Sequence, residues 1–146
     1  MKKIEIAANM SAEIFHAGHI NFLRRVKNHF GEDNVYVTLT VLLSTNKQIK
    51  EFKKREPLID YDLREIVVSS CLYVDKVEPH PDKITYDLVD RFDYLFHGDD
   101  LLDWDSAHIN KGMNLFIEKN KLILLPYTKG ISTTIIIERI KNLSKI

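Results

Sequence analysis

Short apolar segments alternate with amphipathic segments along the 146-residue chain, and this alternation restricts the possible folds more than any other feature. The apolar, β-branched segments predict strands at residues 2–8, 35–43, 74–77, 94–97 and 121–125. Strands joined by helices pair in parallel, and right-handed crossovers place the helices on both faces of the sheet. The sequence therefore predicts an α/β fold, a Rossmann-like doubly wound sheet of five parallel strands, in a single domain spanning residues 1–146.

The intervening segments carry apolar residues at helical spacing. Helices are predicted over 18–30, closed by Gly31, over 61–72, capped by Asp60, near 83–91, and from Ser132 or Thr133 to about Leu143. We expect a common face of the second helix to hold Leu63, Ile66, Val67 and Ser70, and a buried stripe of the last to hold Ile135, Ile136, Arg139 and Ile140. Residues 46–57 predict a surface loop or short helix, and 103–118 give no clear prediction.

Composition excludes several classes of protein. The 21 Lys and Arg residues balance 21 Asp and Glu residues, so we expect no nucleic-acid partner. No apolar window approaches the ~18–20 residues of a membrane span, and the N-terminal residues do not resemble an export signal. The single Cys71 allows no internal disulfide, and a buried, inert thiol is expected there. A cytoplasmic location is the resulting expectation.

Ligands of open parallel sheets bind at the carboxyl ends of the strands, which selects four loops: 9–19, 44–57, 98–104 and 126–133. The first contains His16-Ala17-Gly18-His19 at a predicted helix start, where two imidazoles and free backbone N–H groups can meet an anion. Gly18 lets a phosphate approach the backbone. The alternatives are a capped helix with two surface histidines, or a zinc site, for which no further ligand lies nearby.

Three other loop segments add to this edge. Residues 128–134 precede the last helix and combine a turn at Gly130 with hydroxyls that suit a second anion cradle or a plain helix cap. His97-Gly98-Asp99-Asp100 ends a strand and can accept hydrogen bonds from a sugar, bind a divalent ion, or form a polar turn. The basic stretch 47–55 is a solvated face or a polyphosphate site. Together these segments suit the binding of a nucleoside triphosphate and transfer of part of it.

The same residues resemble the H-x-G-H nucleotidyltransferases, specifically the cytidylyltransferases that activate small phospho-alcohols. The family motif G-T-F-D-x-x-H-x-G-H corresponds to residues 10–19, and R-T-x-G-I-S-T-T corresponds to residues 127–134. Phe52-Lys53, Arg64, residues 71–77 and residues 97–100 follow the family order, so the resemblance spans nearly the whole chain. Departures from the motifs are Met10, Ala12, Glu13 in place of Asp, and Tyr127 in place of Arg. We expect the neighbouring cation Lys129 to compensate for the missing arginine.

The resemblance implies a role for each matching position. His16 and His19 would contact the CTP phosphates as catalytic residues, Lys53 and Arg64 would hold substrate phosphates, and Ser132 with Thr133 would grip the β- and γ-phosphates. The remaining implied nucleotide-binding positions are Ser11, Glu13, Gly18, His97, Gly98, Asp99, Asp100, Tyr127, Thr128, Gly130 and Ile131. Trp104 and His108 are candidates for the acceptor pocket.

The expected reaction is transfer of CMP from CTP, with Mg²⁺, to a small phosphorylated alcohol of the glycerol-phosphate or phosphoethanolamine type. The products are a CDP-alcohol and pyrophosphate, and the resemblance also implies a homodimer. Two alternatives stay open: adenylyl transfer on the same fold, and a nucleotide-binding module without turnover. The irregular first motif motivates the former, and Glu13 and Tyr127 motivate the latter.

Overall fold

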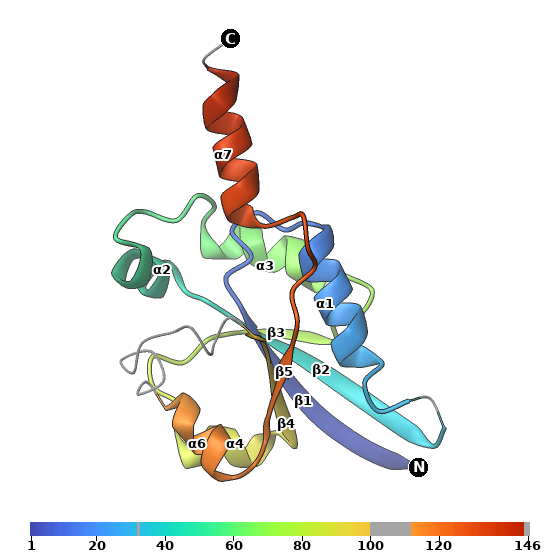
Figure 1. Cartoon of the computed structure of the whole chain (residues 1–146). Coiled ribbons are helices and arrows are strands. Elements are labelled where there is room, and N and C mark those ends of the chain that lie inside the picture. The colour runs from blue at the N-terminus through green and yellow to red at the C-terminus, as the bar shows by residue number, and fades with distance from the viewer. Residues whose placement is uncertain (32, 100–111, 145–146) are drawn as a thin grey trace.

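The computed structural model describes residues 1–31, 33–99 and 112–144. Its five strands form one parallel sheet in the order β3-β2-β1-β4-β5 (Figure 1). The strands are β1 (Lys2–Met10), β2 (Val35–Leu43), β3 (Lys76–Pro79), β4 (Tyr94–Gly98) and β5 (Leu122–Leu125). The chain moves outward from β1 through β2 to β3 and then returns to the other side of β1 as β4, so the strand order reverses between β1 and β4. The predicted doubly wound α/β fold is confirmed.

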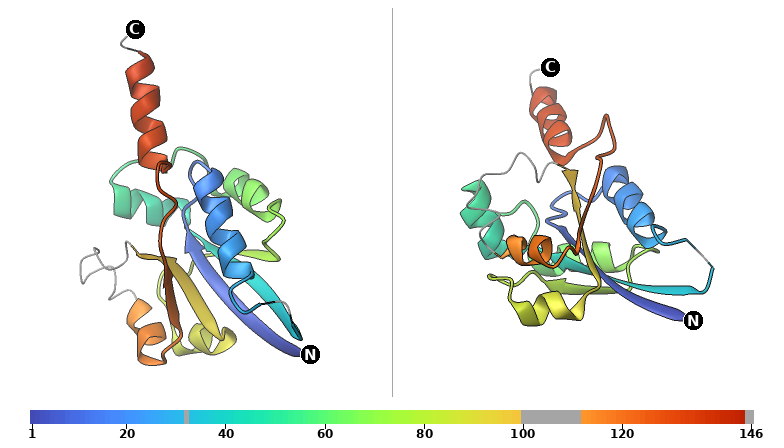
Figure 2. Two further views of the ribbon diagram at one scale, coloured as in Figure 1. Left: turned by 45° about the vertical axis from the view of Figure 1, so that its right-hand side comes forward. Right: turned by 60° about the horizontal axis from the view of Figure 1, so that its bottom comes forward.

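Helices cover both faces of this sheet (Figure 2). Helices α1 (Ala17–Lys27) and α3 (Tyr61–Ser69) pack on one face, and α4 (Tyr86–Arg91) and α6 (Met113–Glu118) pack on the other. Successive strand residues point to opposite faces. In β1, therefore, Ile6 and Ala8 belong to the core under α1 and α3, whereas Ala7 belongs to the core under α4 and α6. Burial on both faces explains why the strands are almost uniformly apolar.

Helix α3 carries most of its large apolar side chains on a side that does not pack on the sheet. Its buried residues are Arg64 and Val68, while Leu63 is 57% exposed and Ile66 is 62% exposed. The common face expected for Leu63, Ile66, Val67 and Ser70 is thus the exposed one. On the inner side the guanidinium of Arg64 donates to loop carbonyls below the helix. The backbone cap also differs, since the N–H of Tyr61 donates to the side chain of Asn46 and Asp60 makes no side-chain cap.

Two further helices lie at the carboxyl edge of the sheet. Helix α2 (Asn46–Lys53) is the short helix that was one of the two alternatives expected there. Helix α7 (Thr133–Leu143) begins where predicted but projects away from the body in every view (Figures 1 and 2). None of its residues is buried, so the predicted buried stripe of Ile135, Ile136, Arg139 and Ile140 was wrong for this chain alone. Cys71 is also only half-buried.

Candidate active site

The two histidines of the first loop cap α1. The imidazole Nδ1 of His16 accepts a hydrogen bond from the N–H of Gly18 at 3.0 Å, and Nδ1 of His19 accepts from the N–H of His16 at 3.1 Å. This reciprocal arrangement is a capping box, which satisfies N–H groups that a helix start otherwise leaves without partners. Both Nδ1 atoms therefore act as acceptors, and a neutral ring then carries its proton on Nε2.

Both imidazoles are held in the neutral form. Burial lowers the pKa of His16 below its usual value. Burial, followed by the neighbouring charges of His16 and Lys53, lowers the pKa of His19 to about 4. The two rings lie 4.0 Å apart between centroids, and Phe15 stacks on His19 at 5.3 Å. At neutral pH the pair can donate Nε2–H to an oxyanion but contributes no formal positive charge.

The turn before α7 lies beside the start of α1. A Cβ added to Gly18 would be 2.8 Å from Cε1 of His16 and 3.4 Å from a methyl group of Ile131. Asn21 donates to the hydroxyl of Thr128 at 3.4 Å, and Arg25 donates to the Pro126 carbonyl at 2.7 Å. The structure thus brings together the histidine loop and the hydroxyl-rich turn, which are more than 100 residues apart in the sequence.

Within this turn, Gly130 has φ +86°, a left-handed conformation that favours glycine. Ser132 is the N-cap of α7, and its hydroxyl accepts from the N–H of Ile135 at 3.1 Å. Thr133 is the first residue of the helix. Two helix N-termini, those of α1 and α7, therefore lie at one edge, and the dipole of each helix favours an anion there.

Glu13 is the centre of a buried ion cluster. Its carboxylate is 1% exposed and accepts from Nζ of Lys53 at 2.7 Å, from both terminal nitrogens of Arg55 at 2.8 and 3.0 Å, and from the N–H of Leu58 at 3.0 Å. Burial raises its pKa, but these donors outweigh burial and lower the pKa to about 2. Glu13 therefore anchors Lys53 and Arg55, and its own oxygens are already engaged by protein donors.

Arg64, expected to hold a substrate phosphate, is 1% exposed. Its guanidinium donates to the carbonyls of Ile59, Ser11 and Ser44 at 2.7–2.9 Å and to the side chain of Asn46 at 3.0 Å. These bonds tie together the loops that follow β1 and β2. The geometry favours a structural role for Arg64, and phosphate binding by it stays a prediction.

The end of β4 packs against the turn after β5. A Cβ at Gly98 would lie 2.6 Å from Cζ and Oη of Tyr127, so the aromatic ring takes the space that the missing side chain leaves. Tyr127 is 58% exposed, His97 is buried with Nδ1 3.0 Å from the Gly98 carbonyl oxygen, and Asp99 is exposed. Asp100, Trp104 and His108 lie outside the described residues. In this structure, therefore, the space beside Gly98 is occupied by an aromatic ring of the protein itself.

The basic stretch does not act as one cluster. Lys47 pairs with Asp82 at 3.3 Å and Lys50 with Glu56 at 2.7 Å, whereas only Lys53 and Arg55 reach the Glu13 carboxylate. Sequence reasoning missed the contacts of Arg55 with Glu13 and of Phe15 with His19. A possible indication was that Glu13, an acid in a segment expected to bind phosphate, needs cationic partners.

Comparison with known proteins identifies the family. The sequence profile of the cytidylyltransferase-like family matches residues 11–139. An FAD synthase of Pyrococcus horikoshii is 29% identical over 97% of this chain and 95% of its own length. A glycerol-3-phosphate cytidylyltransferase of Staphylococcus aureus is 32% identical over 84% of this chain and 83% of its own. A lipopolysaccharide core biosynthesis protein of Thermoplasma volcanium shares the fold, with a TM-score of 0.62 and 20% identity over 88% of this chain and 98% of its own.

The fold and the profile define a nucleotidyltransferase of the Rossmann-like class. More narrowly, the chain belongs to the cytidylyltransferase-like family. None of the helices in the described part of the chain is long and apolar enough to cross a membrane.

The low pKa of His19 predicts a specific dependence of stability on pH. The unfolded chain binds more protons than the folded chain between the unfolded value of 6.5 and the folded value of about 4. The free energy of unfolding should therefore decrease as pH falls through this window, by up to about 3 kcal/mol from this group. His19→Gln removes the titration and keeps a capping-box acceptor, so its urea-unfolding free energy should decrease less between pH 7 and pH 4. His29→Gln, at an exposed position, should retain the full wild-type decrease, and equal slopes for all three proteins would contradict the prediction.

The ion cluster predicts a cost for neutralising Glu13. Glu13→Gln leaves Lys53 and Arg55 without their carboxylate, and because both cations are about one-third exposed we expect a loss of about 2 kcal/mol in unfolding free energy at pH 7. Chemical denaturation measures this loss. The matched control is Glu51→Gln on the exposed side of α2, which should change stability by less than about 0.5 kcal/mol. Equal effects of the two substitutions would show that the cluster does not hold the loops.

Proposed function

We propose that the protein transfers CMP from CTP to the phosphate of a small phosphorylated alcohol of the glycerol-phosphate or phosphoethanolamine type. The observation that carries this proposal is the meeting of the His16–His19 pair with the Thr128–Thr133 turn at the ligand-binding edge of the sheet. Cytidylyltransferase relatives named for glycerol-3-phosphate support the choice of nucleotide and acceptor. The family motif over residues 130–134 supports the same branch.

The reaction is a displacement at the α-phosphorus of CTP. An oxygen of the acceptor phosphate forms the new bond to this phosphorus, and the bond from the phosphorus to the oxygen bridging the β-phosphate breaks, so pyrophosphate leaves. The acceptor phosphate is already ionised at neutral pH, so no general base is needed. Catalysis then consists of alignment and of stabilising negative charge on the α-phosphate and the leaving group.

The described residues can stabilise that charge in two ways. His16 and His19 can donate Nε2–H as neutral imidazoles, because their Nδ1 atoms accept backbone N–H bonds. Lys53, which is 30% exposed at the edge of the ion cluster, supplies a positive charge near them. Ser132, Thr133 and the N-terminus of α7 suit the departing β- and γ-phosphates.

We infer that Mg²⁺ is brought by the triphosphate and that the protein does not hold it in a preformed cage. Among the residues that the structure describes, no group of three or more His, Cys, Asp or Glu side chains could hold a metal ion. Asp99 is exposed at the end of β4, and Glu13 is engaged by protein donors. Magnesium in nucleotide sites usually keeps several waters and binds substrate phosphates, where it neutralises their charge.

Adenylyl transfer is a second candidate, because FAD synthases are among the relatives that span nearly the whole chain. FAD contains an adenylyl group joined to a flavin phosphate, so its synthesis is the same displacement with ATP as donor. Tyr127, in place of the motif arginine, lies beside Gly98 at this edge and gives the chain a site that differs from the cytidylyl pattern. A homodimer remains part of the proposal.

A pyrophosphate-release screen tests the proposed reaction. CTP and ATP are each supplied with Mg²⁺ and a panel of glycerol-, ethanolamine-, choline- and flavin-phosphates, and we expect release with CTP and one of the small phospho-alcohols. Thermal unfolding with each nucleotide serves as the binding control, because a ligand specific for the native state raises the melting temperature. Release with ATP alone would favour the second candidate. A CTP-induced rise without release from any acceptor would indicate a binding module.

The role of His19 predicts a loss of turnover without loss of structure. His19→Ala removes the Nε2–H donor from the reacting phosphates, so kcat should fall by about 10²–10³-fold while the circular dichroism spectrum is unchanged. His29→Gln is the control, since His29 lies at the far end of α1 and contacts Phe30 and Phe96. Wild-type turnover in His19→Ala would exclude His19 from the proposed reaction.

A further inference from the structure

The ring of Tyr127 lies directly on the backbone of Gly98, at the carboxyl end of β4. A Cβ built on Gly98 would lie 2.6 Å from Cζ and Oη of Tyr127 and 2.9 Å from Cε2, and these are the three heavy atoms nearest to it. Gly98 is not among the glycines with a positive φ, so its backbone conformation is open to an alanine. The close approach of the ring therefore explains why this strand ends in glycine.

The chain on both sides of Tyr127 is tied to helix α1. The carbonyl of Pro126 accepts a hydrogen bond from Arg25 at 2.7 Å, and the hydroxyl of Thr128 accepts one from Asn21 at 3.4 Å. A tyrosine side chain has only two torsions, so a ring on such a support loses little conformational entropy when a ligand contacts it. The ring is therefore held in place before any ligand arrives.

Although it is held on one side, Tyr127 is 58% exposed. It lies at the edge where ligands of open parallel sheets bind, beside β4, one of the two strands between which the strand order reverses. The next residue along the chain, Thr128, begins the turn that we propose for the phosphates. An exposed aromatic surface is thus placed next to the proposed phosphate site.

We propose that the ring of Tyr127 is the stacking surface for the base of the bound nucleotide, and that Gly98 positions this ring. The face of an aromatic ring carries partial negative charge, which disfavours contact with a phosphate. The small phosphorylated alcohols have no planar group to lie on it, whereas every nucleobase has a flat face that can stack on an aromatic side chain. The identity of the base as cytosine rests on the proposed function, but the stacking itself does not.

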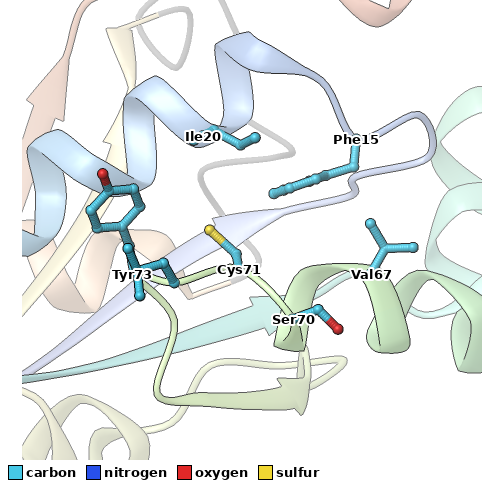
Figure 3. Close-up of a pocket in the computed structure, with 7 residues that line it drawn as sticks. Phe15, Ile20, Val67, Ser70, Cys71 and Tyr73 are labelled. Atoms are coloured by element: carbon cyan, nitrogen blue, oxygen red, sulfur yellow. The ribbon is translucent and has the colours of Figure 1, made fainter.

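The pocket between the start of α1 and the end of α3 suits a base less well (Figure 3). In the described part of the chain its lining is mainly apolar and includes the rings of Phe15 and Tyr73, with Ser70 as a further hydroxyl. A base and its sugar carry polar groups along their edges, and these would leave water there for few hydrogen-bond partners. On Tyr127 only the face of the base is covered, so its edges keep their contact with water.

Substitution of Tyr127 tests the stacking by calorimetric titration in the presence of Mg²⁺. Tyr127→Ala should raise the Kd for CTP and for ATP at least about fivefold, while the Kd for inorganic tripolyphosphate, which carries no base, stays the same. Tyr127→Phe keeps the ring and should keep the affinity. The control is Tyr36→Ala, at a tyrosine that is 55% exposed near the amino end of β2 and should change neither Kd. An equal loss for CTP and tripolyphosphate, or an unchanged Kd for CTP, would overturn the proposal.

A double-mutant cycle tests whether Gly98 acts through the ring. In the wild-type background the methyl group of Gly98→Ala meets the ring and displaces it, so the Kd for CTP should rise while that for tripolyphosphate does not. In Tyr127→Ala the ring is absent, so the same methyl group should cause little further change. Losses that add in the double variant would show that Gly98 acts independently of the ring, which would overturn its positioning role. Circular dichroism checks the fold of each variant.

Pyrophosphate release separates this proposal from the proposed function. Binding that depends on the base and on Tyr127, without release by the wild-type protein for any acceptor, would reject the proposed function and leave the stacking role standing. Release from CTP that Tyr127→Ala retains with an unchanged KM would do the reverse. A raised KM for CTP with little change in kcat supports both, because stacking acts equally on the ground state and the transition state. A wild-type protein that binds neither nucleotide would overturn both.

Discussion

The carboxylate of Glu13 is the interaction on which the ligand-binding edge depends most. A buried carboxylate is costly to desolvate and persists only where donors surround it. Here four hydrogen bonds from Lys53, Arg55 and the Leu58 N–H do so, and they join the loop after β1 to the end of α2 and the segment that follows. The buried guanidinium of Arg64 has the opposite charge and donates hydrogen bonds to backbone carbonyls of the surrounding loops. Together the two side chains hold the loops after β1 and β2 against each other.

In the histidine pair, structural and chemical roles coincide. The capping box uses the Nδ1 atom of each ring, and that use determines which nitrogen is left to donate. Burial and the nearby charge of Lys53 then keep His19 neutral over the pH range in which an exposed histidine would titrate. The same two side chains therefore serve both purposes. Their Nδ1 atoms accept hydrogen bonds at the helix start, and their Nε2–H groups are left to donate in the reaction.

Much of the fold was predictable because its determinants are local. The strands were predicted from their β-branched apolar segments, and the first residue of α7 was predicted from the hydroxyl side chain that caps it. The rotation of α3 was not predictable, since it is set by contacts of Arg64 with carbonyls of Ser11 and Ser44, far away in the sequence. Apolar periodicity identified the exposed faces of α3 and α7 correctly as apolar, but it could not say that they lie outside the core of this chain. In the candidate site, too, the features set by local sequence were predictable and those set by distant contacts were not. The ligand-binding loops were predicted from the strand ends, whereas the pairing of Glu13 with Arg55 is visible only in the three-dimensional structure.

The distribution of charge explains why this edge suits a triphosphate although the whole chain is neutral. Glu13 offsets one of the two cations it holds, and both Lys53 and Arg55 remain about one-third exposed, so the cluster keeps a net positive charge at the surface. The N-termini of α1 and α7 add partial positive charge from two further directions. Elsewhere in the basic stretch, Lys47 pairs with Asp82 and Lys50 with Glu56. These positive charges therefore meet at the carboxyl edge of the sheet, and an anion of several charges gains more from such a converging arrangement than a singly charged one does.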